Sequence, residues 1–178
     1  KAGAWSYAWD NNGGSATSYT FKPTTAGDYQ IKVLVKNTLG NTDANYDYSE
    51  TLTYTIKVWD KCSVSQNKYA ANLYVGDETT LSLTTAGGKT GAWTYAWDNG
   101  GGTTNSYTFK AAAAGEYQVK VLVKNTLGNS FDYTQTLTYT IKVWNKCSVT
   151  QHTYPKALYV DDEVTLSFAH AGGKDNAW

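Results

Sequence analysis

The sequence lacks methionine, contains little proline or cysteine, and has no excess of positively or negatively charged residues. It has no methionine, two prolines and two cysteines among 178 residues, and the strongest helix formers are thinly represented. Lys and Arg (15) equal Asp and Glu (15), so the formal net charge is zero and a basic face for nucleic acid is not expected. No apolar run approaches the roughly 18 residues of a membrane-spanning helix, which predicts no membrane span in this segment.

The residues that are abundant favour β-structure. The chain contains 15 tyrosines, 7 tryptophans and 16 glycines, and apolar residues make up 41% of it. Aromatic and β-branched residues fit the pleated surface of a sheet, and this apolar fraction is sufficient for a hydrophobic core. The chain starts at Lys1 without a charged-then-apolar leader, so we interpret it as a mature or excised segment.

An internal repeat is the strongest feature of the sequence. Residues 3–10 (GAWSYAWD) return as residues 91–98 (GAWTYAWD). Residues 51–59 (TLTYTIKVW) return unchanged as residues 136–144, after three residues have been lost from one loop. A third copy begins before the end of the chain, because residues 171–174 repeat the sequence AGGK. Self-similarity at a fixed period indicates a tandem array of structural units.

Within the middle copy, apolar and polar residues alternate with a period of two between clusters of turn residues. This pattern is typical of antiparallel sheets with one solvated face. Six or seven short strands in about 85 residues predict an all-β fold built as a two-sheet antiparallel β-sandwich. The strands are expected at residues 62–68, 73–75, 78–84, 92–97, 106–110, 116–124 and 136–144.

Three short motifs of the middle copy resemble a known family. They are VGDE at 75–78, YAWDNG at 95–100 and AGEYQVKV at 114–121. These motifs resemble those of bacterial immunoglobulin-like and PKD-like repeat domains, and the chain is similar to the Tyr-rich repeats of Gram-positive cell-surface proteins. The resemblance covers nearly the whole chain and implies tandem immunoglobulin-like sandwiches.

The resemblance also implies roles for four aromatic residues. Trp9 and Trp97 would be the buried tryptophan of the third strand of each sandwich. Tyr29 and Tyr117 would form the tyrosine corner, whose hydroxyl bonds back to the main chain. The sequence departs from the family pattern because each copy has one cysteine rather than a cross-sheet pair, so aromatic packing must hold the core.

Two registers of the repeat are open. In the order that the resemblance implies, residues 61–145 are a complete immunoglobulin-like repeat, residues 1–60 lack their first strands, and residues 146–178 start a further repeat. In the alternative, residues 1–88 and 89–174 are two units, each completed by strands of the following repeat. We favour the first register.

The two cysteines, Cys62 and Cys147, occupy equivalent positions of successive repeats, too far apart for a disulfide within one chain. We favour the interpretation that each is a small buried thiol on the first strand. The alternative is a disulfide between neighbouring chains of an assembly, which an oxidising exterior would allow.

No catalytic or metal-binding pattern is evident. His152 and His170 have no histidine counterparts in the preceding copy and no recurring nucleophile to act on. The acidic turns at 77–78 and 161–163 lack the alternating ligand spacing of a calcium loop. We therefore expect no enzyme activity, no cofactor and no metal site.

Aromatic residues outside the expected core are the candidate functional residues. Trp59 and Trp144 lie on the outward parity at the end of the last strand, and we predict that they pack between successive repeats. Four more flank the loop that changes length between copies, where they either stack on a sugar or fold down over the end of the sandwich. These four are Tyr46, Tyr48, Phe131 and Tyr133.

Together these features lead to two hypotheses of function. The first is a non-enzymatic, extracellular structural protein whose tandem repeats form a bacterial surface stalk, filament or adhesin. Its partners would be neighbouring repeats or copies of itself. The alternative is a glycan- or cell-wall-binding module that uses the loop aromatics. Both hypotheses place the chain outside the cell, on the bacterial surface.

Overall fold

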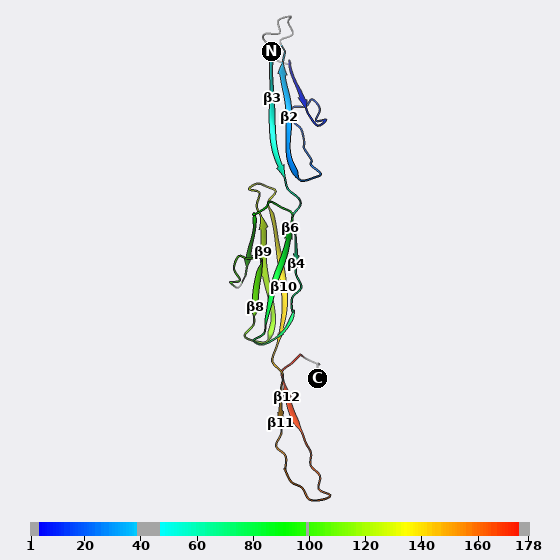
Figure 1. Ribbon diagram of the computed structural model, residues 1–178, viewed down its shortest axis with the longest axis vertical. Coiled ribbons are helices and arrows are strands. Elements are labelled where there is room, and N and C mark those ends of the chain that lie inside the picture. Colours follow the sequence, from blue (N-terminus) through cyan, green and yellow to red (C-terminus); the bar gives the residue numbers. More distant parts are fainter. Residues whose placement is uncertain (1–3, 39–46, 99, 175–178) are drawn as a thin grey trace. The chain divides into compact units, whose positions relative to one another are not determined.

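The computed structural model describes residues 4–38, 47–98 and 100–174, and the regular structure of these residues is all β (Figure 1). The chain divides into two compact units, Lys1–Lys61 and Cys62–Trp178. Among the described residues there is no helix that could cross a membrane.

The larger unit contains two sheets that face each other. One sheet has the strand order β5-β10-β9-β7, and the other has the order β4-β6-β8. Neighbouring strands are antiparallel, except that β5 runs parallel to β10. This is an immunoglobulin-like sandwich and confirms the predicted fold class. The strands are β4 (Ser63–Gln66), β5 (Asn72–Tyr74), β6 (Glu78–Ala86), β7 (Trp93–Trp97), β8 (Ser106–Lys110), β9 (Gly115–Asn125) and β10 (Tyr133–Trp144).

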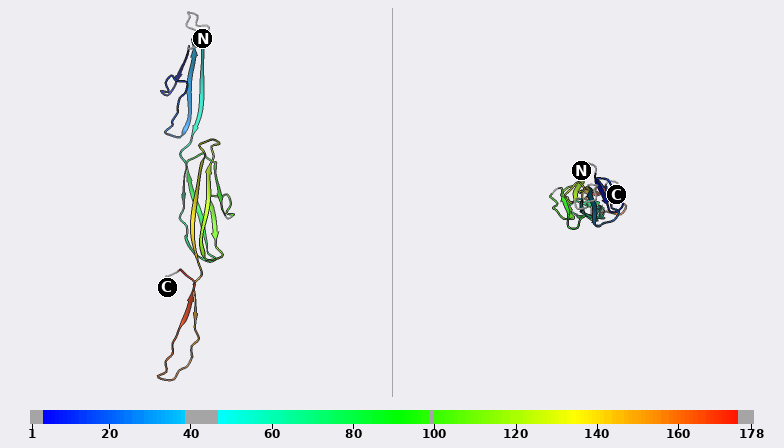
Figure 2. Two further views of the ribbon diagram at one scale, coloured as in Figure 1. Left: turned by 180° about the vertical axis from the view of Figure 1, so that it is seen from behind. Right: turned by 90° about the horizontal axis from the view of Figure 1, so that it is seen from above.

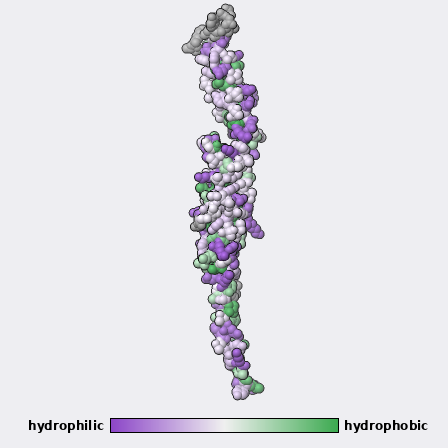
Figure 3. Space-filling view, turned by 60° about the vertical axis from the view of Figure 1, so that its left-hand side comes forward, coloured by the Kyte–Doolittle hydropathy of each residue, from purple (hydrophilic) through white to green (hydrophobic). Residues whose placement is uncertain are grey.

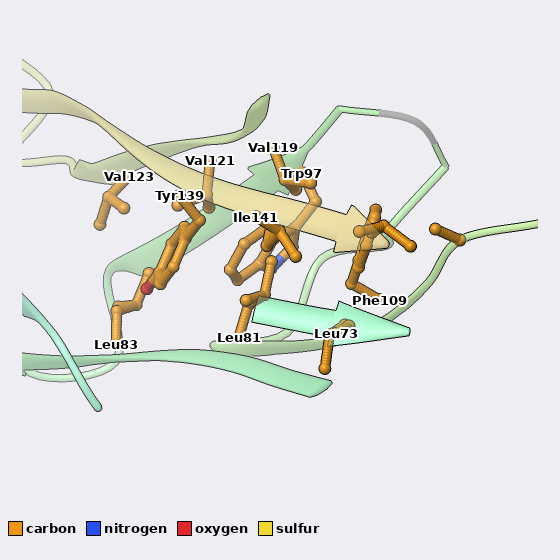
Figure 4. Packing of buried hydrophobic residues seen from close by; sticks show 12 residues of the cluster. Leu73, Leu81, Leu83, Trp97, Phe109, Val119, Val121, Val123, Tyr139 and Ile141 are labelled. Carbon is orange, nitrogen blue, oxygen red and sulfur yellow. The ribbon is translucent and has the colours of Figure 1, made fainter. Parts of the chain in front are cut away.

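The core of the sandwich lies between these sheets (Figure 4). It consists of the apolar side chains that alternate along the strands and point toward the facing sheet. In β9 the valines alternate with exposed Gln and Lys, and in β10 the aromatic and aliphatic residues alternate with exposed Thr and Lys. Leucines from β6 close the core from the opposite sheet. The most completely buried members are Leu81, Leu83, Val119, Val121, Val123, Tyr139 and Ile141.

Tyr139 lies at the centre of this core with no exposed surface. Its ring lies 5.1 Å from the ring of Tyr69 and 5.5 Å from that of Trp97, and its hydroxyl donates a 2.6 Å hydrogen bond to the carbonyl of Ser82 in the facing sheet. Burial, with a smaller contribution from Tyr69, raises the pKa of Tyr139 to about 12. A buried phenol with a satisfied hydroxyl therefore joins the two sheets.

The raised pKa predicts a specific loss of stability at alkaline pH. The unfolded phenol loses its proton near pH 10, whereas folded Tyr139 keeps it to about pH 12. The folded state thus binds more protons in this window, and the free energy of unfolding falls as pH rises, by up to about 1.4 kcal/mol per pH unit. In Tyr139→Phe this contribution to the pH dependence of the free energy of unfolding should disappear. The lost hydrogen bond should also lower the free energy of unfolding by about 1 kcal/mol at neutral pH. Urea denaturation of both proteins across the window measures the two slopes, and parallel slopes would contradict the prediction.

The aromatic roles implied by the family resemblance hold with one correction. The hydroxyl of Tyr117 donates to the carbonyl of Ala113 at 2.9 Å, and that of Tyr29 donates to the carbonyl of Thr25 at 2.9 Å, so both tyrosine corners are present. Trp97 is buried, but Trp9 is only half-buried. The expectation that both tryptophans are core residues is therefore wrong for Trp9.

One end of the sandwich is closed by Asn125, the last residue of β9. Its buried side chain accepts a hydrogen bond from the backbone N–H of Lys89 at 2.9 Å and donates one to the carbonyl of Lys89 at 3.0 Å. Gly88 lies against both Asn125 and Cys62, leaving no space for a side chain at that position. The chain therefore enters the sandwich, at Cys62, beside the C-terminal end of β9.

The smaller unit repeats part of the β5-β10-β9-β7 sheet of the sandwich. Its described strands β1 (Trp5–Trp9), β2 (Gly27–Asn37) and β3 (Tyr48–Val58) form one antiparallel sheet. These three strands are equivalent to β7, β9 and β10. The pairing registers are equivalent: Trp5 faces Asn37 as Trp93 faces Asn125. The described strands of this unit make no second sheet, and the face that is core in the sandwich carries exposed aromatic and aliphatic side chains.

The segment after the sandwich forms a small antiparallel sheet of two strands, β11 (Ser148–Gln151) and β12 (Phe168–Ala171), seen in Figure 2. These strands are equivalent in the repeat to β4 and to the last part of β6. The residues between them contain no described strand, and apolar side chains of the segment are exposed. Figure 3 shows hydrophobic side chains (green) at the surface of this segment, the lowest part of the view.

Candidate functional site

The loop between β9 and β10 is held in shape by its own polar groups. The carboxylate of Asp132 accepts hydrogen bonds from the backbone N–H groups of Leu127, at 2.6 Å, and Gly128, at 2.9 Å. These bonds, the Leu127 bond above all, lower the pKa of Asp132. The side chain of Asn129 accepts a 2.9 Å bond from the N–H of Phe131. The ordered loop therefore presents Phe131 to solvent, with 79% of its surface exposed.

The other loop aromatics lie against the ends of their sheets. Tyr133 packs edge-on against Trp93, with ring centres 5.7 Å apart, and burial raises the pKa of Tyr133. Tyr48 makes the same contact with Trp5 at 5.9 Å. The hydroxyl of Tyr48 donates to the carboxylate of Glu50, a bond that raises the pKa of Tyr48. The tyrosines fold toward the strands, whereas Phe131 does not.

Tyr46, the fourth loop aromatic, lies outside the described residues. Ligand binding by the loop remains a prediction for all four aromatics.

Trp59, just after β3, and Trp144, the last residue of β10, make equivalent contacts with the lysine two residues before each of them. The ammonium nitrogen of Lys57 lies 5.0 Å from the ring centre of Trp59, and that of Lys142 lies 4.5 Å from that of Trp144. Both are within cation–π distance. The indole N–H of Trp144 is buried and has no hydrogen-bond partner among the described residues. Packing between successive repeats stays a prediction for both tryptophans.

Both cysteines are free thiols, but their surroundings differ. Cys62 is half-buried at the end of the sandwich, and burial raises the pKa of its thiol. Cys147 is exposed, and its sulfur lies 3.8 Å from the hydroxyl oxygen of Tyr74. The favoured interpretation of two buried thiols is therefore wrong for Cys147, which is exposed, and holds only in part for Cys62, which is half-buried. A disulfide between chains stays a prediction.

A groove lies on the face of the β1-β2-β3 sheet that corresponds to the core face of the sandwich. Its volume is about 420 Å³. The sequence pattern did not single it out as a site, because its aromatic and aliphatic wall residues correspond to residues of the sandwich core or to residues packed against that core. For example, Trp9 corresponds to Trp97, and Tyr54 corresponds to Tyr139. The lining residues are Trp9, Thr17, Ser18, Tyr19, Phe21, Ile31, Tyr54, Thr55 and Ile56.

The described ranges contain no group of three or more His, Cys, Asp or Glu side chains placed to hold a metal ion. The acidic turns bond to their own backbone instead. Asp77 accepts a 3.1 Å bond from the N–H of Tyr74, and Asp162 accepts a 2.9 Å bond from the N–H of Tyr159. These carboxylates act as turn-forming groups.

Comparison with known proteins finds likeness only among solved structures. No protein-family model matches the chain, and no curated protein sequence does. Among solved structures, the chain is similar to fibronectin(III)-like modules of Clostridium thermocellum CbhA, with 16% identity and a TM-score of 0.35 over 78% of this chain and 76% of that one. At this level of similarity, the assignment to an immunoglobulin-like or fibronectin(III)-like sandwich rests on the strand order of residues 62–145.

Proposed function

We propose that this chain is a non-enzymatic, extracellular structural protein whose tandem immunoglobulin-like repeats build a bacterial surface stalk or filament. The observation that carries the proposal is the repetition of one sheet with one register. β1-β2-β3 and β7-β9-β10 pair residue for residue in the same way. The sequence that follows the last strand also recurs, as VWDKC at 58–62 and VWNKC at 143–147.

The path of the chain through the sandwich suits this role. The chain enters at Cys62, beside Asn125, and Gly88 touches both. It leaves at Trp144, next to Val143, which pairs with Gly115 at the other end of β9. Entry and exit are therefore separated by the 11 residues of β9, or about 35 Å at the usual rise of a strand. A repeat connected in this way adds its long dimension to an array.

Solution scattering on arrays of increasing length tests the stalk. Arrays of one, two and four copies of residues 62–145, joined through the natural junction, should increase in maximum dimension by roughly 40 Å per copy, since one strand length and a short junction are added each time. Growth with the cube root of the mass, as for a compact particle, would overturn the proposal.

The repeat register has its own test. Residues 61–145 contain both sheets and the complete core cluster. We expect this fragment to unfold cooperatively by itself. Residues 1–88 should not, because they contain β4 and β6, which pair with each other, but lack β8, the other strand that pairs with β6. Thermal denaturation followed by near-UV circular dichroism distinguishes them. A cooperative transition in 1–88 alone would favour the other register.

Glycan or cell-wall binding is the second candidate, and the exposure of Phe131 on an ordered loop favours it. A panel of cell-wall and host glycans should then change the fluorescence of neighbouring Trp93 and Tyr133. The change should be lost in Phe131→Ala and kept in Ser130→Ala, a substitution in the same loop. A flat response across the panel would exclude this candidate.

A further inference from the structure

We propose that two copies of this chain associate side by side through the free edge of β7, with the two β7 strands antiparallel to each other. The proposal rests on the proposed function for its setting, because the second copy belongs to a neighbouring stalk or filament, and it names the surface through which the two meet. This edge is part of the complete sandwich, residues 62–145, and the equivalent strand of the other unit is β1.

β7 is the outermost strand of the sheet β5-β10-β9-β7, and β9 is the only described strand that pairs with it. The N–H of Asp98, just after β7, donates to the carbonyl of Lys120 in β9 at 3.0 Å. The main-chain groups of successive residues in an antiparallel strand point to opposite sides. The N–H and C=O groups of Tyr95 and Trp93 therefore point away from β9, toward the free edge.

The other outer strands of the sandwich are protected against pairing. β5 and β4 are only three and four residues long. The side chain of Gln66, at the end of β4, donates a 2.6 Å hydrogen bond to the carbonyl of Thr138 in β10. β8, the outer strand of the facing sheet, ends in Lys110, which pairs with Glu78 at 2.9 Å. Short strands and charged side chains are usual protections of a sheet edge.

β7 has none of these protections. Its sequence, WTYAW, contains no charged residue and no proline. Its pairing with β9 is unbroken over all five residues, so no bulge turns the edge away. The side chains on its outer face, Thr94 and Ala96, are exposed and small, so another strand can approach closely. β1 has the sequence WSYAW and an equally unbroken pairing with β2. An unprotected edge of this kind is a template for pairing with another chain.

A second β7 strand matches the hydrogen-bonding groups of this edge. In an antiparallel pair centred on Tyr95, the two copies of Tyr95 exchange two main-chain hydrogen bonds. On both sides of this centre, the N–H of Trp93 donates to the carbonyl of Trp97 in the other copy. The N–H of Trp97 is already bonded to the carbonyl of Gly102 at 3.2 Å, so only the carbonyl of Trp97 is needed as an acceptor. The edge is therefore complementary to itself, and the contact is isologous.

Side-chain size and charge also permit this contact. In the pair centred on Tyr95, Thr94 faces Ala96 of the second copy on the outer face, and neither side chain obstructs the other. The chain has 15 Lys and Arg residues and 15 Asp and Glu residues, so no net charge keeps two copies apart. One short edge forms only a weak contact. Each repeat supplies another edge, and linked contacts hold more strongly than single ones.

Two charge designs at the outward positions of β7 and β1 test the pairing. The first combines Thr94→Lys and Ala96→Lys with the equivalent Ser6→Lys and Ala8→Lys. Lysine then faces lysine across each edge, and the dissociation constant between copies of the chain should rise by about tenfold. The second design keeps lysine at the first position of each pair and has Ala96→Glu and Ala8→Glu. Lysine then faces glutamate, and association should be at least as strong as in the unmodified chain. Sedimentation equilibrium measures both constants.

Four exposed threonines on other strands provide a matched control. Thr51→Lys and Thr55→Lys on β3, with Thr136→Lys and Thr140→Lys on β10, add the same charge as the first design. This control should associate like the unmodified chain. Urea denaturation shows whether each variant is folded.

Hydrogen exchange gives a second measurement that needs no substitution. The amide of Tyr95 should exchange more slowly as the concentration of the unmodified chain rises, because it gains a partner in the pair. The amide of Ala96 points to β9, so its exchange should not depend on concentration. NMR spectroscopy resolves the two amides.

The proposal is overturned if the unmodified chain remains a monomer up to about 1 mM. It is also overturned if the lysine design associates as well as the unmodified chain, if the lysine–glutamate design does not associate, or if the control loses as much as the lysine design. Exchange of the Tyr95 amide at one rate at all concentrations has the same meaning. None of these results affects the scattering of covalent arrays, so failure of edge pairing is distinguishable from failure of the stalk.

Discussion

Tyr139→Ala should lower the free energy of unfolding of the 62–145 sandwich by about 3–5 kcal/mol, the usual cost of removing a fully buried aromatic ring. The same change at the equivalent residue of the open sheet, Tyr54→Ala, should cost about 1 kcal/mol or less in the monomer, because half of that side chain is already in water. The two tyrosines lie in identical nine-residue sequences, so each is the control for the other.

Urea denaturation at low protein concentration, followed by tryptophan fluorescence, measures both changes. Trp97 lies 5.5 Å from Tyr139 and Trp9 lies 5.8 Å from Tyr54, so each unit has its own reporter. Equal losses in the two variants would show that the face of β3 is covered in solution and would contradict the exposure described here.

Gly88→Ala should lower the free energy of unfolding of the sandwich by roughly 2–4 kcal/mol through a backbone cost and a packing cost. Gly88 has a φ of +70°, a conformation that side chains disfavour. An added Cβ would lie 2.7 Å from the sulfur of Cys62 and 2.8 Å from the side-chain carbon of Asn125. Because Asn125 is held by two hydrogen bonds to Lys89, it has little freedom to move.

Gly91→Ala is the matched control, since Gly91 has a φ of +74° and open space around it. It should show the backbone cost alone, about 1 kcal/mol. The displaced thiol gives a second measurement: Cys62 in Gly88→Ala should react faster with an aromatic disulfide reagent than in Gly91→Ala. Similar stabilities and similar thiol rates would mean that the end of the sandwich accommodates a methyl group.

Alternation along the chain was sufficient to predict the strands and the inward residues of the complete sandwich. Val119, Val121, Tyr139 and Ile141 are buried because the period-two pattern is local, and it assigns them to one face whatever the strand pairs with. The short strands expected at 62–68 and 73–75 were also found, as β4 and β5.

Features that depend on distant partners could not be predicted from these patterns. Residues 18–22 have the same sequence, SYTFK, as strand β8 but do not form a strand. A strand needs a neighbour to accept its hydrogen bonds, and no described strand of this unit pairs with them. Trp5 lies on the core parity and is 52% exposed. The loop provides a further example: burial of Tyr133 against Trp93, with Phe131 left exposed, depends on hydrogen bonds made by Asp132 that spacing does not reveal.

The parallel pairing of β5 with β10 has a mechanical consequence. The carbonyl of Trp144 accepts a 2.8 Å bond from the N–H of Val75, and the N–H of Lys142 donates a 2.8 Å bond to the carbonyl of Ala71, just before the chain leaves the sandwich. A force pulling Cys62 and Trp144 apart acts along these strands rather than across them. The hydrogen bonds between β5 and β10 must then break together in shear rather than one after another. A repeat that is pulled from its two ends therefore resists unfolding at the C-terminal end of β10.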